Sequence, residues 1–179
     1  MGSHAIKTAR LDLTTFAESD IRELVPLIGA REVAETTLRI PHPYEERHAR
    51  EFLLSEIKEN ELRLTIRLRS DGRLCGGIGL HPDSEPHQAE LGYWIGVPFW
   101  GNGYATEAGR VVVGFGFKQL KFNRIFAAHF AGNEASGRVL QKIGMLYGGR
   151  MRQAVVKSGK FIDVERYAIL RENYLATEE

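Results

Sequence analysis

Hydrophobic and polar side chains alternate most regularly in residues 62–69, which read LRLTIRLR. Leucine or isoleucine occupies every second position there, and arginine or threonine fills the positions between. This period of two is typical of a β-strand with one buried and one exposed face. Asp71-Gly72 then provides a hairpin turn pair, and the glycine-rich residues 73–80 follow as the partner strand. The pattern therefore predicts an antiparallel pair of strands.

Further strands are predicted on both sides of this pair. Residues 9–16 and 124–130 read as single strands, and residues 152–170 as a hairpin that turns at Ser158-Gly159. Residues 88–97 alternate again, so their side chains divide between two faces. One face carries Ala89, Leu91, Tyr93 and Ile95, and the other carries Glu90, Gly92 and Trp94.

Helical spacing of apolar residues appears in four other segments. Residues 18–33 are expected to be helical, and residues 45–60 form an amphipathic helix. A third helix is expected to begin near Tyr104, and Asn133 caps a short fourth helix that Gly144 ends. The apolar residues at helical spacing are Ala49, Phe52, Leu53 and Ile57 in the second helix, Ala108, Val112 and Phe115 in the third, and Val139 and Ile143 in the fourth. Together the elements predict an α/β (α+β) fold with a mixed, mostly antiparallel central sheet flanked by helices.

Composition narrows the class of protein. The 179 residues carry 24 Lys and Arg against 23 Asp and Glu, a balance that argues against a polybasic nucleic-acid-binding protein. Cys75 is the single cysteine and so cannot form an internal disulfide, which favours a reducing, cytoplasmic location. No apolar run is long enough to span a membrane, and no secretory signal pattern is present. We therefore expect neither nucleic acid nor membrane as a partner.

The segment WGNGYATEA, residues 100–108, places two glycines between a strand and a helix. The first turn of a helix has unpaired N–H groups, and glycines let an anion approach them. The segment does not fit the dinucleotide pattern G-x-G-x-x-G, because Thr106 stands three residues after Gly103. It also lacks the G-K-[ST] of a phosphate-binding P-loop. The residues alone leave an anion site and a simple structural turn equally open.

Two motifs in order give a more specific indication. Residues 100–105 are similar to the acyl-CoA motif [R/Q]-x-x-G-x-[G/A], with Trp100 in place of Arg or Gln. NEASGRVLQKIGM, residues 133–145, is similar to a second motif, N-x-x-[SA]-x-x-[LV]-x-x-K-x-G-[FM]. With AELGYWI and IPHPY, they make the chain resemble the GNAT family of N-acetyltransferases over residues 8–171. It looks closest to the branch that acetylates the N-termini of ribosomal proteins (RimJ/RimL-like), in which W-G-x-G-Y-A-x-E-A is typical.

The resemblance implies the GNAT acyl-CoA N-acyltransferase fold in one domain, residues 1–179, and acetyl-CoA as cosubstrate. It implies that a strand at Ile95 and Val97 pairs with the pantetheine arm, which Asn133 also contacts. Glu107 is expected to face away from the phosphates, because its charge would repel them. The resemblance assigns the pyrophosphate to the backbone amides of Gly101, Asn102, Gly103, Tyr104, Ala105 and Thr106.

Transfer to an amine requires a group that removes a proton, and Glu90 is the first candidate for this base. A solvated residue on a half-exposed strand is an equally good interpretation of Glu90. Asp163 and Glu165 on the closing hairpin are rival carboxylates. The α-amino group has a reference pKa of about 7.7–8.0, so a weak base acting through water suffices for a protein N-terminus.

The leaving thiolate requires a hydrogen-bond donor or acid. Many members of the family use a tyrosine where this chain has Leu140, which has no proton to donate. Ser136 stands where the ribosomal branch places a serine near the CoA sulfur. The alternative for Ser136 is a local bond at the start of its helix.

The remaining polar residues are interpreted as structural. His129 is expected to be a buried strand residue and Cys75 a core residue. His42, His81 and His87 do not show the spacing of metal ligands, so no metal is expected. Pro41, His42, Pro43 and Tyr44 form either one wall of the acceptor cleft or a plain rigid loop.

Several classes of function stay open beside the main prediction. The acceptor is a protein N-terminus or a small amine such as a polyamine, an amino acid or an aminoglycoside. A second copy of the chain is a candidate partner, in a homodimer. A non-catalytic acyl-CoA-binding regulatory domain is a different class, and a phosphate-binding nucleotide module is a third.

Overall fold

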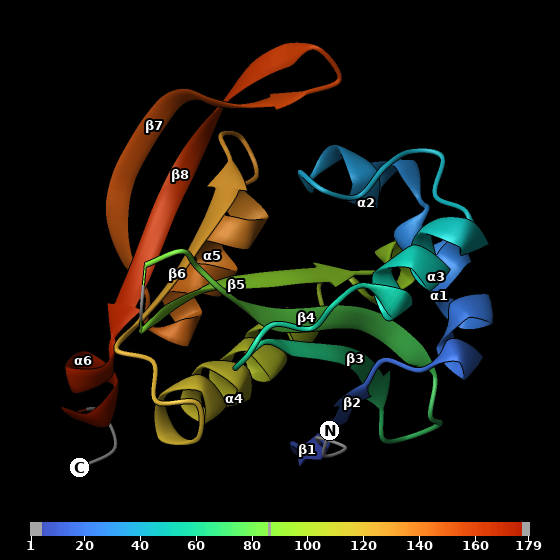
Figure 1. The fold of residues 1–179 in the computed structure, drawn as a ribbon, viewed down its shortest axis with the longest axis horizontal. Helices are drawn as coiled ribbons and strands as arrows, with labels where there is room; N and C mark the ends of the chain where they lie inside the picture. The colour runs from blue at the N-terminus through green and yellow to red at the C-terminus, as the bar shows by residue number, and fades with distance from the viewer. Residues whose placement is uncertain (1–4, 86, 177–179) are drawn as a thin grey trace.

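A computed structural model describes residues 5–85 and 87–176 and has an eight-stranded sheet at its centre (Figure 1). The strand order is β1-β2-β3-β4-β5-β6-β8-β7, and only β5 and β6 run parallel. This confirms the predicted mixed, mostly antiparallel sheet. The strands are β1 (Ala5–Lys7), β2 (Leu11–Thr15), β3 (Leu62–Leu68), β4 (Leu74–Pro82), β5 (Gln88–Ile95), β6 (Arg124–Phe130), β7 (Leu146–Lys157) and β8 (Lys160–Leu170).

Helices cover both faces of the sheet. On one face, α4 and α5 bury the main core, in which Val112, Phe117, Leu80, Ile125 and Leu140 are 0% exposed. On the other, α1 to α3 bury a smaller cluster against Leu74 and Trp94. The helices are η1 (Glu18–Asp20), α1 (Ile21–Ile28), α2 (Arg31–Glu35), α3 (Glu46–Leu54), η2 (Val97–Phe99), α4 (Tyr104–Lys118), α5 (Glu134–Ile143) and α6 (Arg171–Ala176).

The predicted starts and turns of the C-terminal half are confirmed. Helix α4 begins at Tyr104, and the Asn133 side chain accepts a hydrogen bond from the Ser136 amide at the start of α5. Gly144 ends α5 with φ at 102°, a left-handed conformation that favours glycine. The hairpin turns at Ser158-Gly159, where both φ angles are positive.

The polar face of β3 is not open to solvent, which corrects the half-exposed interpretation. Thr65 is buried and its hydroxyl lies 3.0 Å from that of Thr14 on β2. Arg67 forms ion pairs with Asp20 and Glu23 from the η1–α1 segment. The N-terminal helices therefore cover a face that the arginines made look solvated.

Two predicted helices are shorter in the structure. Residues 18–33 break at Gly29, and Ala30 is extended before α2 begins. Helix α3 stops at Leu54, which leaves Ile57 outside it. There the Arg63 guanidinium on β3 donates to the Phe52 carbonyl and to Ser55 Oγ. This contact from a distant strand satisfies the end of the helix, and sequence periodicity does not record it.

The parallel strands β5 and β6 separate part-way along their length. They pair only at Gln88–Arg124, Ala89–Ile125 and Glu90–Phe126. Beyond Glu90, β5 continues beside β4 and β6 continues beside β8. The sheet therefore opens after Glu90.

Candidate active site

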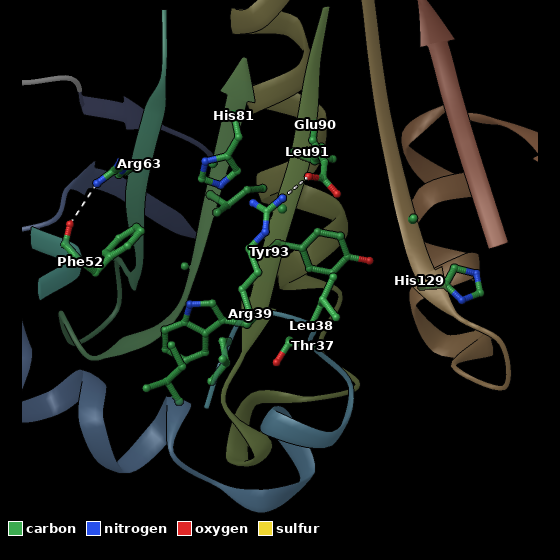
Figure 2. Close-up of a pocket in the computed structure, with 18 of the residues that line it drawn as sticks. Thr37, Leu38, Arg39, Phe52, Arg63, His81, Glu90, Leu91, Tyr93 and His129 are labelled. Atoms are coloured by element: carbon green, nitrogen blue, oxygen red, sulfur yellow. Dashed lines mark hydrogen bonds and ion pairs between the residues drawn. The ribbon is translucent and has the colours of Figure 1, made fainter. Parts of the chain in front are cut away.

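A cleft of about 1260 Å³ lies over this opening. Its walls come from the loop before α3, from β3 to β6, from the start of α5 and from the β7–β8 hairpin. Among its lining residues are Arg39, Glu90, Tyr93 and His129 (Figure 2). Trp94 and Ser136 line it as well. The cleft thus joins the face covered by α1 to α3 with the start of α5.

The glycine turn leads from the end of β5 into α4. Gly101 and Gly103 both have φ at +77°, a conformation that side chains disfavour. A Cβ atom on Gly101 would meet nothing within 4 Å, and one on Gly103 would meet only the end of Arg10. Both glycines and Asn102 are exposed. The turn therefore leaves the first amides of a 15-residue helix open to an anion.

The side chains of the turn bond within it. Asn102 donates to the carbonyls of Phe99 and Trp100, at 3.1 and 3.0 Å. Trp100 Nε1 donates to the Ile95 carbonyl at 2.6 Å. Trp100 therefore ties the turn to β5, which gives a structural reason for an indole at this position.

Arg10 is a cation at this helix terminus that the sequence patterns did not reveal. Its guanidinium lies 4.9 Å from the centre of the Tyr104 ring and donates to the Asn102 carbonyl. Glu107 turns toward Arg10 and Thr8, with oxygens 2.7 and 2.6 Å from their side chains. Partial burial acts to raise the pKa of Glu107, but the hydrogen bonds from Thr8 and Arg10 outweigh it and lower the pKa. Glu107 thus stays ionised, and the positive charge of Arg10 balances its negative charge in an ion pair.

The expected strand at Ile95 and Val97 is wrong in its second half. Strand β5 ends at Ile95, and Val97 begins the 3-10 turn η2, in which Pro98 lacks an amide proton. Val97 contacts the smaller core under α1 to α3. The Ile95 carbonyl already accepts the bond from Trp100.

Glu90 lies at the apex of the opening, because its pairing with Phe126 is the last between β5 and β6. Its side chain is 34% exposed and lines the cleft. Arg39, from the loop after α2, places Nη2 3.1 Å from Glu90 Oε2 (Figure 2). Glu90 is therefore neither buried nor freely solvated.

The rival carboxylates are engaged elsewhere. Glu165 accepts hydrogen bonds from the Tyr147 hydroxyl and from Arg150. The bond from Tyr147, followed by those from Arg150, lowers the pKa of Glu165 below its ordinary value. Asp163 accepts from the Gln153 amide at 2.8 Å. Their neighbours Val164 and Arg166 line the cleft instead, since adjacent strand residues face opposite sides.

The hydroxyl of Ser136 bonds to Tyr93, which the strand pattern had placed on one face with Ala89, Leu91 and Ile95. Its Oγ lies 2.6 Å from the hydroxyl of Tyr93 on β5. Ser136 also keeps the local bond from its amide to the Asn133 side chain, at 3.3 Å. Leu140 is fully buried in the main core. The polar groups near the start of α5 thus include Ser136, Asn133 and Tyr93, and also His129 Nε2 and the Tyr167 hydroxyl, which face Gly137.

Comparison with known proteins decides the family. The family model of the acetyltransferase (GNAT) domain matches residues 10–146. This chain belongs to the GNAT family. YdaF of Bacillus subtilis, named provisionally as a ribosomal N-acetyltransferase, is 37% identical over 105 residues. Those residues are 58% of this chain and 57% of YdaF, so the match spans less than two thirds of that relative.

Solved GNAT structures superpose on nearly the whole chain. An acetyltransferase of the GNAT family from Bacillus anthracis has a TM-score of 0.85 at 26% identity, over 94% of this chain and 99% of that one. Spermidine N-acetyltransferase from Vibrio cholerae, solved with CoA and spermine, has a TM-score of 0.81 at 22% identity. That match also covers 94% of this chain and 99% of the other, and at this identity it establishes a shared fold.

The other residues singled out in this GNAT chain have structural surroundings. His129 is buried, its Nδ1 lies 2.9 Å from the Phe130 carbonyl, and its ring stacks on Tyr167. Its buried Nε2 has no hydrogen-bond partner among the described residues, so the expectation of a fully hydrogen-bonded structural histidine is only partly met. Cys75 is buried in the main core, and burial raises the pKa of its thiol to about 11. Among residues 5–85 and 87–176, no group of three or more His, Cys, Asp and Glu side chains is placed to hold a metal ion. In the same residues no helix has the length and apolar content to cross a bilayer.

The loop after Ile40 contributes in part to the cleft. Pro41 and Tyr44 line it, whereas His42 and Pro43 are exposed. At the opposite wall, Lys157 of the hairpin donates to the carbonyls of Thr37 and Ile40. The loop and the hairpin therefore meet over the cleft.

A buried ionic cluster supports the cleft wall. Glu61 lies between Arg63 and His81, with contacts of 2.8 and 2.9 Å, and its side chain is 6% exposed. Burial acts to raise the pKa of Glu61, but hydrogen bonds from Arg63, the Lys58 amide and His81 lower it to about 2. No pattern in the sequence indicated that Glu61, Arg63 and His81 lie together.

This cluster predicts a pH-dependent stability. Because the pKa of Glu61 falls from an ordinary 4.5 to about 2 on folding, its contribution is complete above pH 4.5 and is lost as pH falls toward 2. Glu61→Gln is expected to cost about 2 kcal/mol at pH 7, because Arg63 is left without its carboxylate. Urea midpoints of wild type and variant should converge between pH 4.5 and 2. The exposed Glu59→Gln is the control, and parallel curves for Glu61→Gln would contradict the assignment.

Proposed function

We propose that this protein is an acetyl-CoA-dependent N-acetyltransferase that transfers the acetyl group directly to a primary amine. The observation that carries the proposal is the opening between β5 and β6, where Glu90 and Ser136 line one cleft. The exposed glycine turn follows the end of β5 and leads into α4. Both glycines of the turn are left-handed and leave open space over the helix terminus, so an anion can approach the amides there. Acetyl transfer makes three demands on the protein. It must hold acetyl-CoA in place, remove a proton from the amine and stabilise the thiolate that leaves.

The residues divide these tasks. The amides of Gly101 to Thr106 hold the pyrophosphate at the positive end of α4, with Arg10 adjacent. Asn133 and the edge of β5 up to Ile95 contact the pantetheine arm. Glu90 accepts the proton of the amine, directly or through water. Ser136 donates a hydrogen bond to the sulfur as the carbon–sulfur bond breaks.

The favoured acceptor is the α-amino group of a protein N-terminus, such as that of a ribosomal protein. The likeness to YdaF supports this choice. The charges of the cleft support it as well, because Glu61 is paired with Arg63 and Glu90 with Arg39. A carboxylate paired with an arginine attracts a polycation less strongly than a free carboxylate does, so this cleft is less suited to a polyamine.

A small polyamine is the second candidate, and a specific observation favours it. The fold matches a spermidine N-acetyltransferase over 94% of this chain. The acidic residues Glu51, Glu56 and Asp83 also line the cleft and would attract a cationic chain.

An acceptor screen tests the proposal. The wild-type protein is mixed with acetyl-CoA and a thiol reagent, and with N-terminal peptides, spermidine, amino acids or aminoglycosides. We expect CoA release fastest with a peptide. Acetyl-CoA binding without turnover on any acceptor would support a non-catalytic acyl-CoA-binding domain. Calorimetry that detects no acetyl-CoA binding would contradict the proposed function altogether.

A further inference from the structure

Tyr93 reaches across the opening in the sheet. It follows Glu90, the last residue of β5 that pairs with β6, by three positions. Its hydroxyl lies 2.6 Å from Ser136 Oγ and 3.4 Å from the Ser136 carbonyl on α5. Figure 2 shows the Tyr93 ring extending from β5 into the space beside β6. The contact is therefore a polar bridge from the strand to the helix where the sheet itself is open.

The chemistry of the two hydroxyls favours one direction for this hydrogen bond. A phenol is the more acidic group and hence the better donor, with an ordinary pKa of about 10. Burial raises the pKa of Tyr93 to about 12, and the bond to Ser136 opposes this only in part. Tyr93 thus keeps its proton at neutral pH, and either hydroxyl can be the donor in its bond with Ser136 Oγ. When Tyr93 is the donor, the hydrogen of Ser136 is left to be donated elsewhere.

The start of α5 is held so that this hydrogen has a defined direction. The Asn133 side chain accepts the Ser136 amide at 3.3 Å, which fixes the first turn. Leu140, one turn further along, is fully buried and apolar. The hydroxyls of Tyr93 and Ser136 therefore bond to each other at this end of α5. The Tyr167 hydroxyl lies next to Gly137 in the same turn.

We propose that Tyr93 is a positioning residue for acetyl transfer, which donates to Ser136 Oγ and so directs the Ser136 hydroxyl hydrogen at the sulfur of the leaving group. This inference rests on the proposed function. The amine nitrogen bonds to the acetyl carbon, and the carbon–sulfur bond breaks with its electron pair on sulfur. The amine loses one proton to Glu90 or water, and the thiolate gains one from solvent. Neither hydroxyl is consumed, because each supplies a hydrogen bond and keeps its proton.

A double-mutant cycle tests the coupling. Tyr93→Phe keeps the ring and removes the donor, and we expect kcat to fall about tenfold with little change in the KM for acetyl-CoA. Ser136→Ala should lower kcat at least as much. Because Tyr93 acts through Ser136, the double variant should be no slower than Ser136→Ala alone. Losses that multiply in the double variant, or an unchanged kcat in Tyr93→Phe, would overturn the inference.

A binding measurement gives a readout apart from turnover. CoA ionised at its thiol should bind wild type more tightly than desulfo-CoA, which lacks the sulfur, by about tenfold above pH 8.5. The preference should shrink in both Ser136→Ala and Tyr93→Phe. Equal binding of the two probes by wild type would overturn the inference, even where Tyr93→Phe failed to fold.

Controls separate this inference from the proposed function. Tyr174→Phe removes a tyrosine hydroxyl on α6, whose ring packs on Phe117 away from the cleft, and it should retain wild-type kcat. A wild type that neither binds CoA nor turns over any amine contradicts the proposed function. A wild type that is active, with multiplicative losses in the cycle, contradicts only the role of Tyr93.

Discussion

Replacement of Gly103 by valine is expected to weaken acetyl-CoA binding about hundredfold. At φ +77° a side chain costs about 1–2 kcal/mol, and the cost is higher for a β-branched residue. The valine would also stand over the open amides at the start of α4 and weaken their bonds to a phosphate. The strain lowers stability, whereas the loss of hydrogen bonds lowers affinity. A hydrogen bond to a charged group contributes about 1.5–3 kcal/mol, so the lost bonds account for about 3 kcal/mol, or a factor of roughly a hundred in Kd. Isothermal titration calorimetry with acetyl-CoA measures the effect.

Gly72→Val is the matched control. Gly72 has φ at +75° and open space around it, so valine there carries the same backbone strain in the β3–β4 turn. We expect it to lower thermal stability by a similar amount and to leave Kd unchanged. Equal Kd values for Gly103→Val and wild type would rule out the glycine turn as the pyrophosphate site.

Glu90→Gln is expected to lower kcat/KM about hundredfold at pH 7, at the lower end of what general-base catalysis contributes. Glutamine keeps the size of the side chain and its reach into the cleft, but it accepts no proton. The deficit should shrink as pH rises past about 8, because an α-amine is then largely neutral before it binds. Steady-state rates from pH 6 to 9 with the best acceptor from the screen measure it.

Variants of the rival carboxylates give the comparison. Asp163→Asn and Glu165→Gln should lose less activity than Glu90→Gln, since both carboxylates accept hydrogen bonds from residues of β7 in the same hairpin. Circular dichroism is needed for Glu165→Gln, because Arg150 loses its ion pair. A full loss in Asp163→Asn beside an active Glu90→Gln would transfer the role of base to the hairpin.

Local patterns were sufficient for much of the fold. Strict alternation in residues 62–69 located β3, and helical spacing after two glycines located α4. Asn133 and Gly144 marked the limits of α5 because caps act within one turn of chain. The family followed from two motifs whose chemistry lies in the backbone, so that glycine at fixed positions was itself the signal.

The patterns failed where a distant residue changed the outcome. The end of α3 depends on Arg63 from β3, which bonds the Phe52 carbonyl. The sequence pattern predicted that the strand face with Arg67 is solvated. In the structure Arg67 instead forms ion pairs with Asp20 of η1 and Glu23 of α1. Apolar periodicity reports which face is buried and cannot report which charged partner arrives from elsewhere.

The sequence by itself determined the family, the order of most elements and the position of the glycine turn, because these depend on residues close together in the chain. The tertiary structure alone decided that β5 and β6 part after Glu90, that Arg10 stands beside α4, and that Tyr93 meets Ser136. The physical reason is the separation of the partners along the chain. The strand period placed Tyr93 on an apolar face, but its hydroxyl bonds to Ser136, 43 residues further on, across the opening in the sheet.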